Sequence, residues 1–388
     1  MSKFTDFGYT QAQINEKFQQ VLDTIFTNEE TKFYYDNGDG TAYFTDTGND
    51  DVRTEGMSYG MMIALQLDDQ AMFNKFWAWV NKYMLITDGP MHGFFKWSAQ
   101  RSGVSNAEGS APDGEEFFAA ALLMAANRWG DGEGIFNYTA EAKSLLHEMV
   151  HKDEEEGGRG MFDPETTYIR FVAEMDISDP SYHLPHFYEV YAQYGNEEDR
   201  AFFERAADAS REYLKKAMNP ETGMSAEYAN YDGTPNDFRG HGSFFSDAYR
   251  TAANVGLDAA WTGKVDAELT DRVVKLQEFY KGQIEQENIP VYWIDGTIVG
   301  DKETEDGQSL LYVKHPVALK AGMAQSTLAT PNNELSKYYV DLFWNLPMRD
   351  GVYRYYDNLL YLFAFMSLAG MYNKYDKQAS ADRVLVTN

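Results

Sequence analysis

The chain has 388 residues, no cysteine and a formal net charge of −28. The missing cysteines exclude disulfides, thiolate metal sites and cysteine nucleophiles. The acidic balance disfavours nucleic acid and anionic membranes as partners and is compatible with a neutral ligand. No apolar run reaches the ~18 residues of a membrane span, and the N-terminus does not resemble a signal peptide, so we expect a cytoplasmic location.

One class of predicted helix is half-exposed. Its members carry apolar residues at spacings of three and four with charged residues between them, which is typical of amphipathic helices. In chain order they are 10–27, 138–152, 196–218 and 266–284. Strand patterns are scarce, and IPVYWIDGTIV (289–299) is the best candidate for a hairpin.

A second class of predicted helix begins with an acidic or polar residue and continues with small, apolar residues. A helix that is apolar on most sides is buried on most sides. Six segments fit: 54–67, 112–129, 179–194, 246–261, 314–329 and 355–372. Five successive starts, from Glu55 to His315, are separated by roughly 60 to 70 residues, about one helical hairpin plus a long loop.

This alternation predicts an all-α fold, an (α/α)6 barrel of six inner and six outer helices in a single domain, 1–388. Inner helices of such a barrel run parallel, so their first residues meet at one end. We therefore expect one face to collect Glu55, Asp113, Asp179, Asp247, His315 and Asp357. The alternative for each carboxylate is a helix N-cap, although Glu is not among the preferred capping residues.

The sequence lacks the phosphate-binding loop, HExxH and GxSxG patterns. His183 and His186 are a possible metal pair, but histidines satisfied in the core are more common, and we predict no metal and no cofactor. Two carboxyl groups, one protonated and one ionised, are what glycoside hydrolysis needs. Glu55 starts an apolar helix, where burial would raise its pKa and keep it protonated.

The segment APDGEEFFAAALLMAANRW (111–129) resembles the signature of glycoside hydrolase family 8. It departs from that signature at Pro112, Glu115 and Phe118 and keeps Ala111, Asp113, Gly114, Ala119, Ala121 and Trp129. Other segments, in order along nearly the whole chain, resemble the branch of reducing-end xylose-releasing exo-oligoxylanases. Among them are DTGNDDVRTEGMSYGMM, DISDPSYHLPHFYE and FFSDAYRTAANVGLD.

The resemblance implies an inverting hydrolase of β-1,4-xylo-oligosaccharides with the same barrel fold. By resemblance Glu55 is the general acid, Asp247 is the base that activates water, and Asp113 holds the sugar at the cleavage point. Inversion implies that the carboxyl groups of Glu55 and Asp247 lie roughly 6.5–9.5 Å apart.

The resemblance also implies sugar contacts at Trp97 and Tyr182, and places Arg53 beside the acid. His315 matches the histidine on a segment that closes the leaving-group side, which would admit one sugar beyond the scissile bond. No obligate protein partner is expected. Two alternatives stay open: an endo-xylanase or endoglucanase of the same family, and a non-catalytic sugar-binding barrel.

Overall fold

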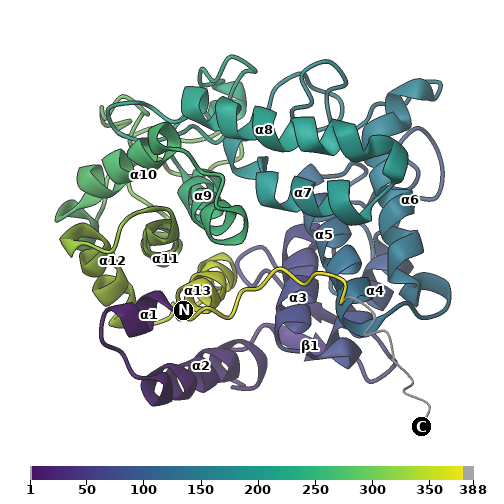
Figure 1. The fold of residues 1–388 in the computed structure, drawn as a ribbon, viewed down its shortest axis with the longest axis horizontal. Coiled ribbons are helices and arrows are strands. Elements are labelled where there is room, and N and C mark those ends of the chain that lie inside the picture. Colours follow the sequence, from purple (N-terminus) through teal and green to yellow (C-terminus); the bar gives the residue numbers. More distant parts are fainter. Residues whose placement is uncertain (1, 379–388) are drawn as a thin grey trace, which may run out of the picture.

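A computed structural model describes residues 2–378, so residue 1 and residues 379–388 of the predicted 1–388 domain lie outside the described residues. Helices dominate this part of the chain, and they form the two concentric rings of an (α/α)6 barrel (Figure 1). The predicted fold class is therefore confirmed.

The inner ring is closed. Each inner helix contacts the next one along the chain, and the last, α13, contacts the first, α3. The six members are α3 (Thr54–Gln66), α5 (Pro112–Trp129), α7 (Pro185–Tyr194), α9 (Tyr249–Thr262), α11 (Pro316–Ser326) and α13 (Arg354–Leu368). Nearly all residues of α13 and most of α3 and α5 are buried, as their apolar sequences predicted.

The outer ring surrounds these helices. It consists of α2 (Gln11–Phe26), α4 (Gln70–Tyr83), α6 (Tyr138–His151), α8 (Arg200–Ala217), α10 (Ala267–Tyr280) and α12 (Glu334–Trp344), and the short α1 (Lys3–Asp6) precedes it. Of these, α4 and α12 were not singled out from the sequence. Helix α2 shows the shared pattern: it buries one stripe, Ile14, Phe18, Val21 and Ile25, and its other residues are partly or fully exposed.

Small residues allow the inner helices to approach closely. A side chain at Gly256 of α9 would lie 2.4 Å from the carbonyl oxygen of Gln325. A side chain at Gly322 of α11 would lie 2.4 Å from the carbonyl oxygen of Tyr249. The glycines on both helices thus set the contact between α9 and α11, since any Cβ there would force the backbones apart.

The two rings differ at their helix starts. Five outer helices begin with a side-chain cap that accepts a hydrogen bond from the backbone: Thr10, Asp69, Asn137, Asp266 and Asn333. No inner helix has such a cap. The acidic residues at the inner helix starts are therefore not used to cap those α-helices.

Two predicted inner helices begin later than expected. Residues Pro180–Tyr182 form a 3-10 turn, η3, and α7 starts only at Pro185, because proline is favoured in the first helical turn and disfavours a helical residue before it. Asp179 caps η3 by accepting a hydrogen bond from the backbone of Ser181. Asp247 lies in a second turn, η6 (Ser246–Ala248), directly ahead of α9.

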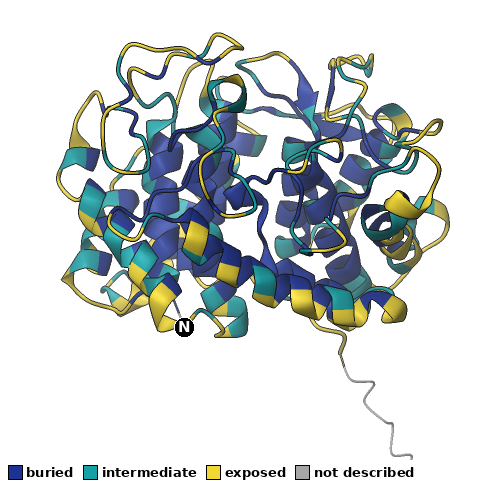
Figure 2. Ribbon diagram, turned by 90° about the horizontal axis from the view of Figure 1, so that it is seen from above, coloured by how far each residue is buried: buried dark blue, intermediate teal, exposed yellow. Residues whose placement is uncertain are grey.

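Short strands and long loops lie at the barrel ends (Figure 2). The strands are β1 (Tyr34–Asp36) paired with β2 (Ala42–Phe44), and β3 (Val52–Arg53) paired with β4 (Ser98–Ala99). Residues 289–299 form the expected hairpin-like turn, with an antiparallel bridge between Tyr292 and Ile298. The remaining 3-10 turns are Gly134–Phe136, Lys152–Glu154, Glu197–Asp199, Phe238–Gly240, Gln283–Glu285 and Thr327–Ala329.

Candidate active site

Arg250 lies at the centre of the predicted carboxylates. It is on the first turn of α9 and is 5 % exposed. Its Nη1 lies 3.3 Å from Oε2 of Glu55 and 3.4 Å from Oδ2 of Asp113. Its Nη2 lies 3.4 Å from Oδ1 of Asp247. One buried cation thus brings together three side chains from α3, α5 and η6 that are far apart in the sequence.

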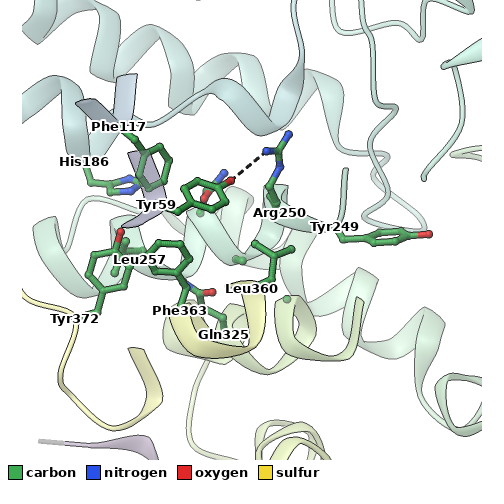
Figure 3. A pocket seen from close by; sticks show the side chains of 13 residues that line it. Tyr59, Phe117, His186, Tyr249, Arg250, Leu257, Gln325, Leu360, Phe363 and Tyr372 are labelled. Carbon is green, nitrogen blue, oxygen red and sulfur yellow. Dashed lines mark hydrogen bonds between the residues drawn. The ribbon is translucent and has the colours of Figure 1, made fainter. Parts of the chain in front are cut away.

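Further hydrogen bonds fix this guanidinium. Arg250 donates from Nη1 to the hydroxyl of Tyr59 over 3.1 Å (Figure 3) and from Nη2 to the hydroxyl of Ser181 over 3.0 Å. Its Nε donates to the backbone oxygen of Asp247 over 3.2 Å. A planar guanidinium held from several sides is a rigid template for the carboxylates around it.

Glu55 lies in the first turn of α3 and is surrounded by protein. The hydroxyl of Tyr355 donates to its Oε1 over 3.0 Å. Burial is the largest effect and raises the pKa of Glu55 to about 7. The positive charge of Arg250 lowers this pKa, whereas the negative charges of Asp113 and Asp247 raise it. A carboxyl group with this pKa is still partly protonated at neutral pH, which suits a general acid.

Asp113 lies in the first turn of α5, where Pro112 begins the helix. Burial raises the pKa of Asp113 to about 6, while Arg250 lowers it and Asp247 raises it further. Gly114 permits close contact with α3, because a side chain there would lie 2.6 Å from the hydroxyl of Thr54. The neighbouring turns that carry Glu55 and Asp113 are therefore packed directly together.

Asp247 is the most exposed of the three carboxylates that surround Arg250. Its side chain is 30 % exposed, compared with 17 % for Glu55 and 10 % for Asp113. Asp247 is therefore the most accessible of the three to a water molecule, and Glu55 and Asp113 are better shielded from solvent. The arrangement therefore separates a shielded, protonatable group from a solvated one, as acid–base catalysis requires.

Trp97 and Arg53 form a platform beside Glu55. The guanidinium carbon of Arg53 lies 5.2 Å from the ring centroid of Trp97, and Trp97 is 38 % exposed. Asp51 and Asp46 hold the other side of Arg53, with Nε to carboxylate distances of 3.1 and 3.3 Å. An exposed indole face next to the carboxylates is a surface on which a sugar ring can stack.

Tyr182 and His315 lie at the same end of the barrel. Tyr182 is buried, and its ring lies 5.8 Å from the guanidinium carbon of Arg250. The Nδ1 atom of His315 lies 2.9 Å from Oδ2 of Asp357, which also accepts a hydrogen bond from Arg349 over 2.6 Å. The other oxygen of Asp357 accepts from the backbone of Ala318. Asp357 thus acts as an anchor for the segment that carries His315.

The ring nitrogens of His183 are not free to bind a metal, so His183 and His186 do not form a metal-binding pair. Both ring nitrogens of His183 are hydrogen-bonded, to Ser178 over 2.7 Å and to Ser210 over 2.8 Å. Burial lowers the pKa of His186 to about 4, so its ring is neutral.

A separate group of possible metal ligands, His92, Glu148 and Glu155, lies near the surface. There the ammonium group of Lys152 contacts both glutamates and supplies the positive charge.

An internal cavity lies deeper in the barrel, below Arg250 (Figure 3). Its wall includes Tyr59, Phe117, His186 and Phe363, and its volume is about 30 Å³. That volume has room for roughly one or two water molecules. A sugar ring does not fit there.

Several residues of this site were not predicted from the sequence. They are Arg250, Tyr59, Ser181, Tyr355, Glu227 and His241. A signal for one of them was present: Arg250 follows Asp247 by three residues and stands in a largely apolar helix, where an unpaired arginine is rarely buried. Tyr355, Glu227 and His241 carry no comparable signal.

The described residues, 2–378, contain no helix with the length and apolar character that crossing a membrane requires.

Residues 25–369 match the family described as glycosyl hydrolases family 8. The chain is 50% identical to a reducing end xylose-releasing exo-oligoxylanase of Halalkalibacterium halodurans, over 95% of this chain and 92% of that protein. It is 48% identical to a protein of the same name from Bifidobacterium adolescentis, over 96% of each chain.

The comparison with solved structures agrees with these sequence comparisons. A variant of a reducing-end-xylose releasing exo-oligoxylanase complexed with xylobiose has a TM-score of 0.91 and 48% identity, and the match covers 97% of both chains. The resemblance noted from the sequence motifs is therefore confirmed, and an enzyme is supported over a non-catalytic sugar-binding barrel. The chain belongs to glycosyl hydrolase family 8 and is a glycoside hydrolase.

Proposed function

We propose that this enzyme releases xylose from the reducing end of β-1,4-xylo-oligosaccharides with inversion at the cleaved carbon. The observation that carries the proposal is the unequal burial of Glu55 and Asp247 around one guanidinium. The similar proteins named for reducing-end xylose release, and the complex of one of them with xylobiose, support the substrate class. We propose that 1–388 acts as one catalytic domain and that the enzyme works on oligosaccharides in the cytoplasm.

In this mechanism Glu55 donates its proton to the glycosidic oxygen as the bond to the leaving xylose breaks. Asp247 accepts a proton from water, and the water oxygen forms the new bond to the anomeric carbon from the opposite face. Glu55 thus ends as a carboxylate and Asp247 as an acid. A proton exchange with solvent restores both for the next turnover. Arg250 stabilises the carboxylate form in each state, since it contacts both groups.

The contacts of the two groups with Arg250 are compatible with inversion. Glu55 and Asp247 each contact a different nitrogen of the same guanidinium, at 3.3 and 3.4 Å. Their contacting oxygens therefore lie no farther apart than about 9 Å. This limit is compatible with the ~6.5–9.5 Å at which inverting enzymes place a water molecule between the sugar and the base.

Asp113 is proposed to hold the hydroxyl groups of the sugar at the cleavage point, and Trp97 and Tyr182 to contact sugar rings. Arg53 orients Trp97 beside the acid. His315 is proposed to close the leaving-group side, so that one sugar fits beyond the scissile bond. An endo-acting enzyme of the same family would instead need an open groove there.

Substitution of the two carboxylates tests the proposed roles. Glu55→Gln and Asp247→Asn should each lower kcat by about 100-fold or more, because each removes one proton-transfer step, while the binding of xylobiose stays largely intact. Asp258→Asn is a matched control, because Asp258 is a carboxylate that also pairs with an arginine, Arg211, but lies farther along α9. The control should lose stability and keep its turnover. Near-normal turnover of both test variants would refute the assigned roles.

A further inference from the structure

The backbone that carries Asp247 is strained. Ser246 has a φ of 36°, a left-handed conformation that a residue with a side chain rarely adopts. Such conformations persist only where the surroundings hold them in place, and they occur often at functional sites. The strain lies one residue before the proposed base, so its release would move the carboxylate of Asp247.

Three contacts hold this strained turn. The hydroxyl of Tyr356 donates to the backbone oxygen of Ser246 over 2.8 Å. The Nε of Arg250 donates to the backbone oxygen of Asp247. The backbone N–H of Asp247 donates to Oε2 of Glu227 over 3.3 Å. The first two contacts come from Arg250 and Tyr356 of the inner helices α9 and α13, whereas Glu227 lies earlier on the long connection between α8 and α9.

Glu227 is itself fixed by His241. Its Oε1 lies 2.8 Å from Nδ1 of His241, and both side chains are nearly inaccessible to solvent. Burial raises the pKa of Glu227 to about 7. Burial opposes the charged form of His241, but the hydrogen bond and charge of Glu227 outweigh it and raise the pKa of His241 to about 9. The pair therefore retains a proton over the whole neutral range.

The same chain of contacts reaches the segment before His315. The Nε2 of His241 lies 3.3 Å from Oδ1 of Asp306. The backbone N–H of Glu305 donates to the backbone oxygen of Arg239, which ties this segment to the loop of His241 a second time. The chain Asp306–His241–Glu227 thus joins the loop ahead of α11 to the backbone of Asp247.

We propose that Glu227 is a positioning residue for the hydrolysis, held by His241, and that it orients the carboxylate of Asp247 by fixing the backbone of the turn Ser246–Ala248. This inference rests on the proposed role of Asp247 as the base. Glu227 is only 3 % exposed and does not contact Arg250 through an ion pair, so it is not placed to meet water or sugar itself. It acts on the reaction through Asp247.

A double-mutant cycle separates positioning from a purely structural role. Glu227→Gln keeps the shape of the side chain but weakens its bonds to His241 and to the backbone. We expect it to lower kcat by about 10- to 100-fold with KM changed by less than about threefold, because a small displacement of a catalytic group has an effect of this size. In an Asp247→Ala background the same substitution should change kcat by less than about twofold, because the group it positions is gone.

His151→Gln is the matched control. His151 bridges two carboxylates, Asp199 and Glu154, on the outer helix α6, away from the cleft. This variant should show a lower Tm with kcat within about twofold of the parent. His241→Gln is a second test variant for the same cycle, in case Glu227→Gln does not unfold cooperatively. It should lower kcat by a similar factor in the parent, and this loss should disappear in the Asp247→Ala background.

Each outcome decides the proposal. An equal loss of kcat in the parent and in the Asp247→Ala background would overturn it, and so would the absence of a loss in the parent, which keeps Asp247. Failure of both Glu227→Gln and His241→Gln to fold would overturn it as well, since it would assign the pair to the stability of the fold. If Asp247→Ala alone keeps its activity, the role of the base fails. If Asp247→Ala is inactive while Glu227→Gln is fully active, only the positioning role fails.

Discussion

Tyr355 donates a hydrogen bond of 3.0 Å to Glu55, and its ring lies against the glycine that follows Glu55 in the sequence. A side chain at Gly56 would lie 2.5 Å from the hydroxyl oxygen of Tyr355. The small residue after the proposed acid therefore has a specific function: it makes room for the tyrosine that holds the acid.

Gly56→Ala should displace Tyr355 and remove its hydrogen bond to Glu55. We expect kcat to fall by about 10-fold or more and Tm to decrease, since the tyrosine is buried and cannot move freely. Gly109→Ala is the control, because a side chain there meets open space. Steady-state kinetics and thermal unfolding of both variants check this. A Gly56→Ala variant as active as the control would contradict it.

The pH dependence of kcat/KM should have a falling limb near pH 7. The proposed acid must be protonated to donate its proton, and the raised pKa of Glu55, about 7, means that the protonated fraction declines as pH rises through that value. Rates measured on xylotriose from about pH 5 to 9 give the profile. A rate that stays constant up to about pH 9 would exclude Glu55 as the acid.

Glu115 should make the fold less stable as pH rises. It is buried, it accepts one hydrogen bond from the backbone of Phe95, and its other oxygen has no partner. Burial raises the pKa of Glu115 from 4.5 to about 8. Between these values the folded state holds a proton that the unfolded state releases, so the free energy of unfolding falls with rising pH.

Glu115→Gln should remove this contribution. The difference in unfolding free energy between about pH 5.5 and 8 should become smaller by on the order of 1–3 kcal/mol, measured by urea denaturation. Glu165→Gln, at an exposed position, should leave the difference unchanged. An equal pH dependence in parent and Glu115→Gln would show that Glu115 is ionised in the folded protein.

His315→Ala should open the leaving-group side. Asp357 and the ring of Tyr356 hold the imidazole in place, and its removal leaves space for a second sugar beyond the scissile bond. We expect xylobiose to appear among the products cut from the reducing end of labelled xylotetraose, together with a lower rate of xylose release. His92→Ala, at the surface, should release xylose only. Unchanged products from His315→Ala would assign the closure to other residues.

Much of the fold was predictable because each inner helix is apolar on most sides and starts with a polar residue. The predicted bounds of α5, 112–129, coincide with those in the structure. The start of α7 was not predicted, because the prolines at 180 and 185 divide a continuous apolar pattern into a turn and a helix. The glycines of α9 and α11 show why small residues indicated inner helices: they lie where two inner helices approach closely, although the sequence does not say which helices are neighbours.

The site was predictable only in part. Glu55, Asp113 and Asp247 stood out as acidic residues at the starts of buried helices, and they converge on one cation. Glu227 and His241 lie on the same irregular connection between α8 and α9, and their pairing depends on how this connection folds back on itself. No periodicity records such a fold, so contacts of this kind emerge only from the three-dimensional structure.

Xylotriose labelled with carbon-13 at its reducing-end anomeric carbon tests the central claim most directly. Proton and carbon NMR during hydrolysis follow the position of cleavage and the configuration of the new end together. We expect the label to appear in free xylose, and the unlabelled xylobiose to form first as its α-anomer, because inversion converts a β-linkage into an α-hydroxyl. Label in xylobiose, or xylobiose that forms first as its β-anomer, would contradict the account.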